Sequence, residues 1–258
     1  GEGHIYALDV DPIEIVKTKK RLEDKGYGEE ILTILNTNFA NISEVANEYG
    51  KFDFMMADLG VSSMQIDNPE RGFSYKTDGP LDLRLKPQKG VSAAERLKEL
   101  TREEFEGMMV ENSDEPYALE ISRVVMSHLR KGKPVKTTKD LYNCIEEALS
   151  FIPEKERKEA VKKSCQRTFQ ALRIDVNSEF EVLDRFLESL PDVLVSGGRV
   201  AILTFHSGED RLVKKSFKKF LKQGVYSEVA QDVIRPSAKE CAENPRAKST
   251  KMRWAVKA

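Results

Sequence analysis

The amino-acid sequence predicts an α/β fold with a mostly parallel sheet and an inserted helical domain. Near the N-terminus, short apolar strands at Ile5–Asp9, 31–35 and Phe52–Asp58 alternate with segments of helical character. A long region of helical periodicity then covers residues 92–170, and a strongly apolar strand returns at 199–205. Strands that alternate with helices are typical of a parallel sheet covered by those helices. The helical region predicts an insertion into that sheet.

The N-terminal part repeats a unit of strand and helix. The strand Ile5–Asp9 ends in an acid, and Pro12 stands where a helix begins, because proline suits the first helical turn. We expect this helix to run to about residue 22. A second helix is predicted at 43–48, and the third strand again ends in an aspartate, Asp58.

Residues 59–87 break this rhythm, since they are rich in Gly, Ser, Asp and Pro and show no sustained period. A loop of this length in a compact protein is usually functional or disordered. Beyond it, Thr101 and Glu104 have the spacing of a helical capping box. We therefore predict a core formed by residues 1–87 and 168–258, with a helical insertion at 88–167.

The sheet pattern returns in the C-terminal part. A helix is predicted from Ser178 to residue 190, a turn at Gly197 and Gly198, and a strand at 199–205. A further helix follows to about residue 223. The segments 226–235 and 251–256 then have the character of a closing pair of strands.

Composition and charge exclude several classes of protein. The 258 residues carry 42 Lys and Arg against 43 Asp and Glu, so a net charge of -1 gives no global attraction to nucleic acid or membrane. Three widely spaced cysteines fit a reducing compartment, and we expect a cytoplasmic protein. The apolar runs are too short to cross a bilayer, and no phosphate-binding loop of the nucleoside triphosphatases occurs.

Several polar residues are expected at the carboxyl ends of the strands, where open parallel sheets bind their ligands. Asp9 is placed to accept the hydroxyls of a ribose, Phe39 to lie against a purine, and Asp58 to stand where cofactor and substrate meet. The alternatives are that each aspartate caps a helix and that Phe39 belongs to the core. His206 follows a strand, as either a general base or a structural donor.

The long loop offers groups that suit RNA. Small residues after Asp58 allow a flat substrate to approach the backbone, and Phe73 lies beside Arg71 and Arg84 in the loop sequence. Such a mixture of aromatic and cationic side chains can stack a base and hold its phosphates. The alternative is an ordered structural loop held by its own hydrogen bonds.

Three segments are basic and contain no acid: 130–139, 211–222 and 244–258. For 211–222 we favour a solvated helix face. In the last segment, Asn244 and Arg246 lie in an Asn-Pro-Arg turn that presents its charge on a loop, where phosphate contact is plausible.

Four motifs in order resemble one known family. They are Asp-Leu-Gly-Val-Ser-Ser from Asp58 with Arg-Gly-Phe-Ser from Arg71 and Asp-Gly-Pro-Leu-Asp-Leu-Arg from Asp78; Phe-Gln-Ala-Leu-Arg-Ile-Asp-Val-Asn from Phe169; Gly-Gly-Arg-Val-Ala-Ile-Leu-Thr-Phe-His-Ser from Gly197; and Asn-Pro-Arg from Asn244. The chain resembles the MraW/RsmH family of bacterial methyltransferases over nearly its whole length. The resemblance implies a class I S-adenosylmethionine-dependent (Rossmann-like) methyltransferase core with an inserted helical domain. It also implies methylation of the exocyclic N4 of a cytidine in 16S ribosomal RNA.

The resemblance implies roles for particular residues. Cofactor contacts fall on Asp9, Phe39, Asp58 and Gln65, and Asp58 becomes the catalytic candidate, as an acceptor for the hydrogens of a poorly nucleophilic amino group. The candidates for RNA contact are Ser62, Ser63, Arg71, Phe73, Arg84, Arg173, Asn177, His206, Asn244 and Arg246. No metal is expected, because S-adenosyl-L-methionine carries the electrophile. The implied partner is 16S rRNA or the small ribosomal subunit, and the protein is expected to be a monomer or homodimer.

The chain also departs from the family pattern. The family has a first strand and a Gly-rich turn before the strand that ends at Asp9, so we expect an N-terminally incomplete protein or a divergent paralogue. Met64 and Gly208 replace the usual Pro and Leu. Two other functions stay open: a non-catalytic RNA-binding or ribosome-assembly module of the same fold, and a nicotinamide-dependent oxidoreductase that binds its ribose at Asp9.

Overall fold

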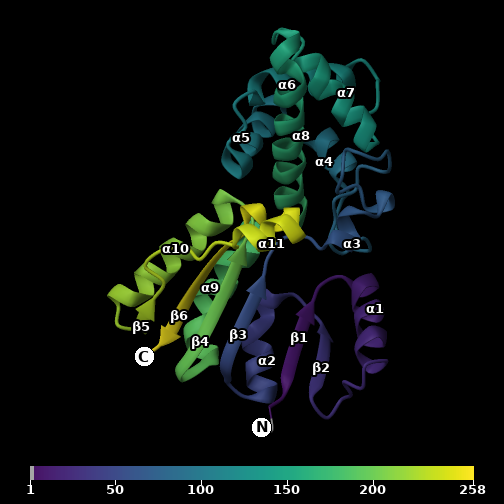
Figure 1. Cartoon of the computed structure of the whole chain (residues 1–258). Helices are drawn as coiled ribbons and strands as arrows, with labels where there is room; N and C mark the ends of the chain where they lie inside the picture. Colours follow the sequence, from purple (N-terminus) through teal and green to yellow (C-terminus); the bar gives the residue numbers. More distant parts are fainter. Residues whose placement is uncertain (1–2) are drawn as a thin grey trace. The chain divides into compact units, whose positions relative to one another are not determined.

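The computed structural model describes residues 3–258, which form two compact units (Figure 1). The sheet unit contains Gly1–Gly60 and Phe180–Ala258, and the helical unit contains Val61–Glu179. The predicted insertion at 88–167 lies inside the helical unit, which also includes most of the long loop. Among the described residues, no helix is long and apolar enough to cross a membrane.

The sheet unit has the expected mostly parallel strands. Strand β1 (Ile5–Asp9) pairs in parallel with β2 (Leu32–Asn36), and β3 (Phe52–Asp58) pairs in parallel with β4 (Leu194–Thr204). Two antiparallel pairings join the second parallel pair, because β6 (Lys251–Lys257) lies between β4 and β5 (Tyr226–Val229). The described strands thus form a four-stranded sheet in the order β3-β4-β6-β5 and a separate two-stranded sheet of β1 and β2. The predicted α/β class and the closing pair of strands are confirmed.

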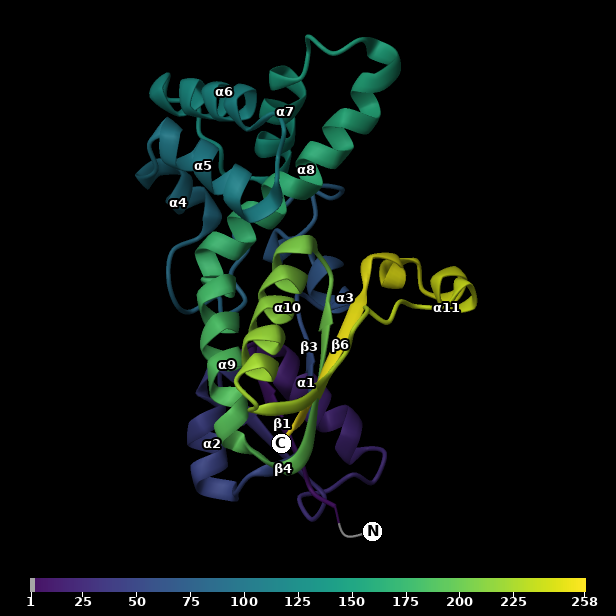
Figure 2. The ribbon, with the colours of Figure 1, turned by 90° about the vertical axis from the view of Figure 1, so that its left-hand side faces the viewer.

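Helices cover one face of this sheet. The unit contains α1 (Pro12–Glu23), η1 (Phe39–Asn41), α2 (Ile42–Tyr49), α9 (Glu179–Val193), α10 (Ser207–Lys222), α11 (Ala238–Glu243) and η3 (Pro245–Ser249). Figure 2 shows α2, α9 and α10 along the same side of the strands, where Val45, Leu190 and Phe217 are buried together. On β3, alternate residues point to opposite faces. Met55 packs into this core, whereas Phe54 and Met56 are 59% and 66% exposed.

The predicted turn at Gly197 and Gly198 is wrong, since both residues lie within β4. The pairing register shifts here, because Phe52 lies opposite Leu194 while Phe54 lies opposite Arg199. Gly197 has a φ of 76°, and a Cβ on Gly198 would stand 3.1 Å from the carbonyl oxygen of Phe52. Between these two pairs β4 has three more residues than β3, so the glycine pair lies where β4 leaves the pairing.

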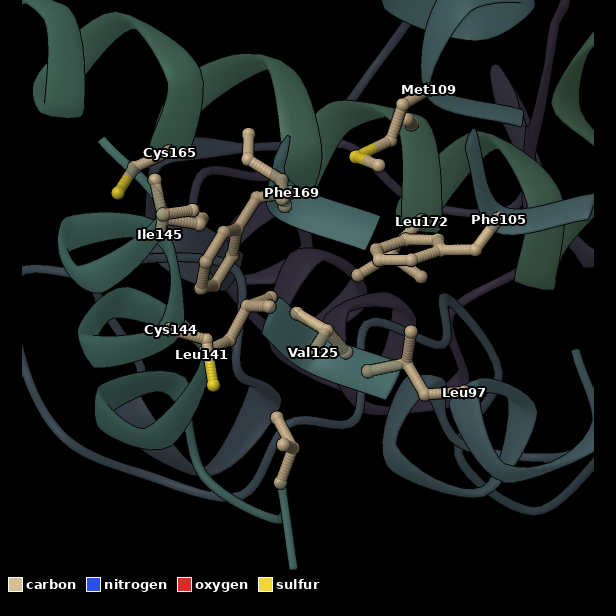
Figure 3. Close-up of a cluster of buried hydrophobic side chains, with 14 of the residues drawn as sticks. Leu97, Phe105, Met109, Val125, Leu141, Cys144, Ile145, Cys165, Phe169 and Leu172 are labelled. Carbon is tan, nitrogen blue, oxygen red and sulfur yellow. The ribbon is translucent and has the colours of Figure 1, made fainter. Parts of the chain in front are cut away.

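The helical unit has its own apolar core (Figure 3). Its elements are α3 (Ser63–Ile66), η2 (Pro69–Arg71), α4 (Ala93–Glu99), α5 (Arg102–Ser113), α6 (Ala118–Arg130), α7 (Thr138–Ala148) and α8 (Glu154–Asn177). Phe105, Ile145 and Leu172 from three of these helices are fully or almost fully buried. The predicted capping box of Thr101 and Glu104 is present at the start of α5.

The long loop is part of this helical core. Leu81 and Leu83 are each only 1% exposed, and Leu81 donates its N–H to the carbonyl of Lys136. A Cβ on Gly79 would collide with the carbonyl group of Pro69, so only glycine permits this close approach of two loop segments. Because the loop buries its apolar residues among the helices, the unit begins at residue 61, earlier than the expected boundary at 88.

Candidate active site

Polar residues follow several parallel strands of the sheet unit where those strands end. Asp9 ends β1, Asp58 ends β3 opposite Leu203, and His206 follows β4. Carboxyl ends of parallel strands share one edge of a sheet. Asp58 and His206 follow two paired parallel strands and so lie at one edge of the four-stranded sheet, whereas Asp9 ends a strand of the two-stranded sheet.

Asp9 presents a carboxylate at the end of β1. Its Oδ1 accepts the N–H of Asp11 at 2.8 Å, while Asp11 itself caps α1. Burial raises the pKa of Asp9, the Asp11 N–H bond opposes that rise, and the carboxylates of Asp11 and Glu14 add to it. Asp9 thus precedes α1 without serving as its N-cap, and its side chain is exposed.

Phe39 lies in η1, directly after β2. Asn38 fixes this turn, because its Oδ1 accepts the N–H of Ala40 at 2.9 Å. The Phe39 ring packs edge-on against Phe186 of α9, with 5.0 Å between ring centroids, and is half-buried. One part of the ring therefore belongs to the core, as the alternative interpretation held, and the remainder is accessible.

Asp58 lies at the end of β3 and has a perturbed carboxyl group. Burial is the main cause of its raised pKa, and the charge of Glu209 raises it further. The next residue is anchored by the bond from the Leu59 N–H to the Leu203 carbonyl at 3.1 Å, and Gly60 has a φ of 85°. A carboxylate with a raised pKa is a stronger base than an ordinary aspartate, which suits acceptance of a proton.

Glu209 is a buried acid that the sequence interpretation did not single out. It is 3% exposed, and its Oε2 accepts the N–H of Phe205 at 2.8 Å. Its Oε1 lies 3.2 Å from Nε2 of His206. The sequence could have indicated Glu209 by its place three residues after His206, the spacing of a helix N-cap and its partner. The His206 imidazole caps α10, because its Nδ1 accepts the Glu209 N–H at 3.4 Å. His206 thus has a structural role here, and its contact with RNA stays a prediction.

The loop arginines bind the loop itself. Arg71 is buried, donates to the carbonyls of Arg84 and Leu85 at 3.0 Å each, and lies over the ring of Phe73. Arg84 forms two hydrogen bonds with Asp82, at 2.8 and 2.7 Å. These contacts match the alternative of an ordered structural loop, and RNA contact at Arg71, Phe73 and Arg84 stays a prediction.

Other sequence candidates also have structural partners. Ser62 and Gln65 form the capping box of α3, in which Oε1 of Gln65 accepts the Ser62 N–H at 2.8 Å, and Ser63 is exposed in the first turn. Gln65 is buried. The structure gives these residues an ordered position, and their contacts with cofactor or RNA stay predictions.

Arg173 and Asn177 lie at the end of α8. Arg173 forms a two-pronged pair with Glu179, and Asn177 bonds the backbone of Leu83 and Leu85 at 2.8 Å each. Asn177 therefore holds the long loop against α8. In the sheet unit, Asn244 caps η3 and Arg246 is exposed, so the Asn-Pro-Arg turn does present its charge on the surface.

The chain is similar to known proteins over its whole length. The model of the MraW methylase family matches residues 1–258. The chain is 67% identical over 257 residues to "Ribosomal RNA small subunit methyltransferase H 1" of Lachnoclostridium phytofermentans, a match that covers 100% of this chain and 70% of that relative. It is 64% identical to the protein of the same name from Agathobacter rectalis, over 100% of this chain and 74% of the relative. "Ribosomal RNA small subunit methyltransferase H 2" of Alkaliphilus metalliredigens is 60% identical, with the same two coverages.

Proposed function

The chain belongs to the MraW methylase family, and on that premise we propose that it methylates the exocyclic N4 of a cytidine in 16S ribosomal RNA, using S-adenosylmethionine as the methyl donor. As a member of this family it is a methyltransferase. Its relatives are named as methyltransferases of small-subunit ribosomal RNA. These names favour an RNA methyltransferase over a non-catalytic RNA-binding module and over an oxidoreductase.

The residues at the strand ends fit the nucleoside half of the donor. Asp9 ends β1 with an exposed side chain, and an aspartate at this point of a parallel sheet can accept both ribose hydroxyls. The accessible part of the Phe39 ring can lie against adenine. Gln65 is proposed as a further contact from the loop. When bound, the donor supplies the electrophilic methyl group.

The observation that carries the proposal is the position of Asp58, an exposed carboxylate at the end of β3 opposite Leu203 of the paired parallel strand, where desolvation also raises its pKa. The amino group of cytosine is a weak nucleophile, because its lone pair is delocalised into the ring. A carboxylate that accepts one N4 hydrogen orients the lone pair and then takes the proton that the methylated nitrogen must lose. We assign this role to Asp58.

The RNA-binding role is proposed for residues beyond this edge. Arg246 on its exposed turn, Asn244 and Ser63 present groups that can reach phosphates or sugar hydroxyls. Residues 88–167 are proposed to recognise RNA as a unit. The partner is 16S rRNA, free or within the small ribosomal subunit.

The test is a methylation assay with an identified product. Purified protein, S-adenosylmethionine and undermethylated small subunits are incubated, and the RNA is digested to nucleosides for mass spectrometry. We expect N4-methylcytidine, and a rate that Asp58→Ala lowers about 10²- to 10⁴-fold. The matched control is Asp53→Ala, which removes an exposed aspartate from the same strand. Near-normal transfer by folded Asp58→Ala would reject the assignment.

A calorimetric titration separates the enzyme from the non-catalytic module. We expect S-adenosylmethionine to bind the wild-type protein. Failure of the wild type both to bind the donor and to transfer methyl groups would favour the module.

A further inference from the structure

The helical unit contains an open groove of about 660 Å³, within the range of sites that hold small ligands. Its walls come from α4, α5, the end of α6 and the loop that follows α6. The groove is lined by Lys98, Arg102, Glu103, Met126, Leu129, Arg130, Gly132, Lys133 and Pro134. All these residues lie inside one unit.

Local structure explains why cations gather here. Lys98 lies next to Leu97, which is fully buried, so the core fixes the position of α4. After α6 the chain turns at Gly132, which has a φ of 70°, and the Lys133 N–H bonds the His128 carbonyl at 3.0 Å. Buried Val135 then anchors the strand of loop beyond Pro134. Segments distant in sequence are thereby held around one groove.

The groove has an excess of positive charge. Arg102 is neutralised, since it pairs with Glu103 at 2.6 Å and with Glu106 at 2.7 Å. Lys98, Arg130 and Lys133 form no ion pair with any residue among 3–258, and all three are exposed. Arg130 donates from Nε to the Met126 carbonyl at 3.4 Å and so keeps its charge. Three cations that are not neutralised by an ion pair favour a ligand that carries several negative charges.

The floor of the groove is apolar. Met126 is buried, Leu129 is half-buried and Pro134 is exposed. Single-stranded nucleic acid matches this combination, because its phosphates meet cations while the planar bases lie on apolar or aromatic surface. A carboxylate-rich peptide would satisfy the charges without using the floor.

We propose that this groove binds a single-stranded segment of the substrate RNA, at a nucleotide other than the one that is methylated. Lys98, Arg130 and Lys133 contact successive phosphates, and a base or ribose lies on Leu129 and Pro134. The inference rests on the proposed function, since it names where that RNA is held. The groove brings Lys98 of α4 next to Arg130 and Lys133, which belong to the basic segment 130–139 of the sequence.

The test compares two triple variants of the whole protein. Lys98→Ala/Arg130→Ala/Lys133→Ala removes the groove cations. The control, Lys214→Ala/Lys215→Ala/Lys218→Ala, removes three exposed lysines from α10 and changes the net charge equally. Binding of fluorescein-labelled oligouridylate of about twelve nucleotides is followed by anisotropy over a range of salt concentrations.

We expect the groove variant to bind at least about tenfold more weakly at low salt, and its salt slope to fall by about 2, or about 0.7 for each lost phosphate contact. The control is expected to keep the wild-type slope. Equal losses in both variants, or no loss in either, would overturn the proposal. A labelled oligoglutamate that binds more tightly than the RNA and depends on the same residues would also overturn it in favour of an acidic protein partner.

The two proposals fail differently. Oligouridylate binding does not require methyl transfer, so a wild-type protein that leaves small-subunit RNA unmethylated rejects the proposed function without deciding the groove. Conversely, normal transfer to small subunits by a groove variant with unchanged RNA affinity rejects the groove alone. Circular dichroism and the affinity for S-adenosylmethionine check that both triple variants remain folded.

Discussion

Charged residues in the two units have different surroundings. In the long loop of the helical unit, Arg71 and Arg84 are bound by carbonyl and carboxylate oxygens of the same loop. At the strand ends of the sheet unit, burial raises the pKa of Asp9 and Asp58, and no cation contributes to lowering either one. The loop arginines therefore stabilise the loop, whereas Asp9 and Asp58 keep exposed carboxyl groups with a raised pKa.

The largest effect on stability is expected at Asp210, an aspartate of the sheet unit that, unlike Asp9 and Asp58, is paired with cations. Asp210 on α10 accepts from Arg253 at 2.7 Å and lies 3.2 Å from Nζ of Lys251, both on β6. Burial alone would raise the pKa of Asp210, but these two cations outweigh it and lower the pKa. We expect Asp210→Asn to lower the free energy of unfolding by about 3–5 kcal/mol at neutral pH, because it leaves Arg253 buried without its anion.

The same pair predicts a dependence on pH. The lowered pKa means that ionised Asp210 stabilises the fold above the ordinary aspartate pKa, and that this contribution is lost as the pH falls through the pKa of the folded state. Denaturant titrations should therefore show the wild type and Asp210→Asn converging in acid. Asp184→Asn, which removes an exposed acid from α9, is the control. A constant difference at all pH values would contradict this account.

The next effect tests the structural role of the loop arginines. Arg71→Ala removes two hydrogen bonds that the buried guanidinium donates to backbone carbonyls, and the contact with Phe73, and should cost about 2–3 kcal/mol of stability. Lys76→Ala, at an exposed position of the same loop, should cost almost nothing. Urea unfolding followed by circular dichroism measures both. Unchanged stability with lost RNA affinity would instead show that Arg71 binds RNA, and the loop arginines would then not differ in role from the strand-end aspartates.

A smaller effect is expected at Asp9. Asp9→Asn keeps the shape of the side chain but weakens acceptance of ribose hydroxyls, so the Kd for S-adenosylmethionine should rise about tenfold. The melting temperature should stay close to that of the wild type, because Asp11 and not Asp9 caps α1. Calorimetry measures the Kd, and Asp24→Asn at the end of α1 is the control. Loss of stability without loss of affinity would make Asp9 structural.

The smallest effect is expected at Glu209. Asp58 must be ionised to accept a proton, so its raised pKa should place the acidic limb of the pH–rate profile above that of an ordinary aspartate. Glu209→Gln removes the repulsion and should shift this limb to lower pH. Glu228→Gln, at an exposed position of β5, should leave the profile unchanged. An upward shift in Glu209→Gln would show that Glu209 does not act on Asp58 through its charge.

Local sequence predicted the positions of the strands well and the irregular pairing within β4 poorly. The strands Ile5–Asp9 and Phe52–Asp58 have the predicted bounds, because short apolar runs between polar segments determine them. The glycine pair at Gly197 and Gly198 was misread, since a bulge and a turn need the same flexible backbone. Only pairing across β3 and β4 distinguishes the two.

The candidate site shows the same limit. Strand-end aspartates can be recognised from their position after an apolar run, and Asp9 and Asp58 were. The partners of Arg71 are backbone carbonyls of residues more than a dozen positions away, which no motif encodes. The groove joins Lys98 to Arg130 and Lys133 through tertiary packing, so the sequence revealed only its contiguous part.

The uncovered face of β3 has a practical consequence for the isolated chain. Phe54 and Met56 project from it side by side in the alternation of the strand, and Ile5 of β1 is 64% exposed. Apolar surface of this kind drives molecules together as their concentration rises, and salts such as sulfate strengthen the attraction. A single polar replacement on this strand, Met56→Thr, should therefore allow more concentrated solutions of the isolated chain.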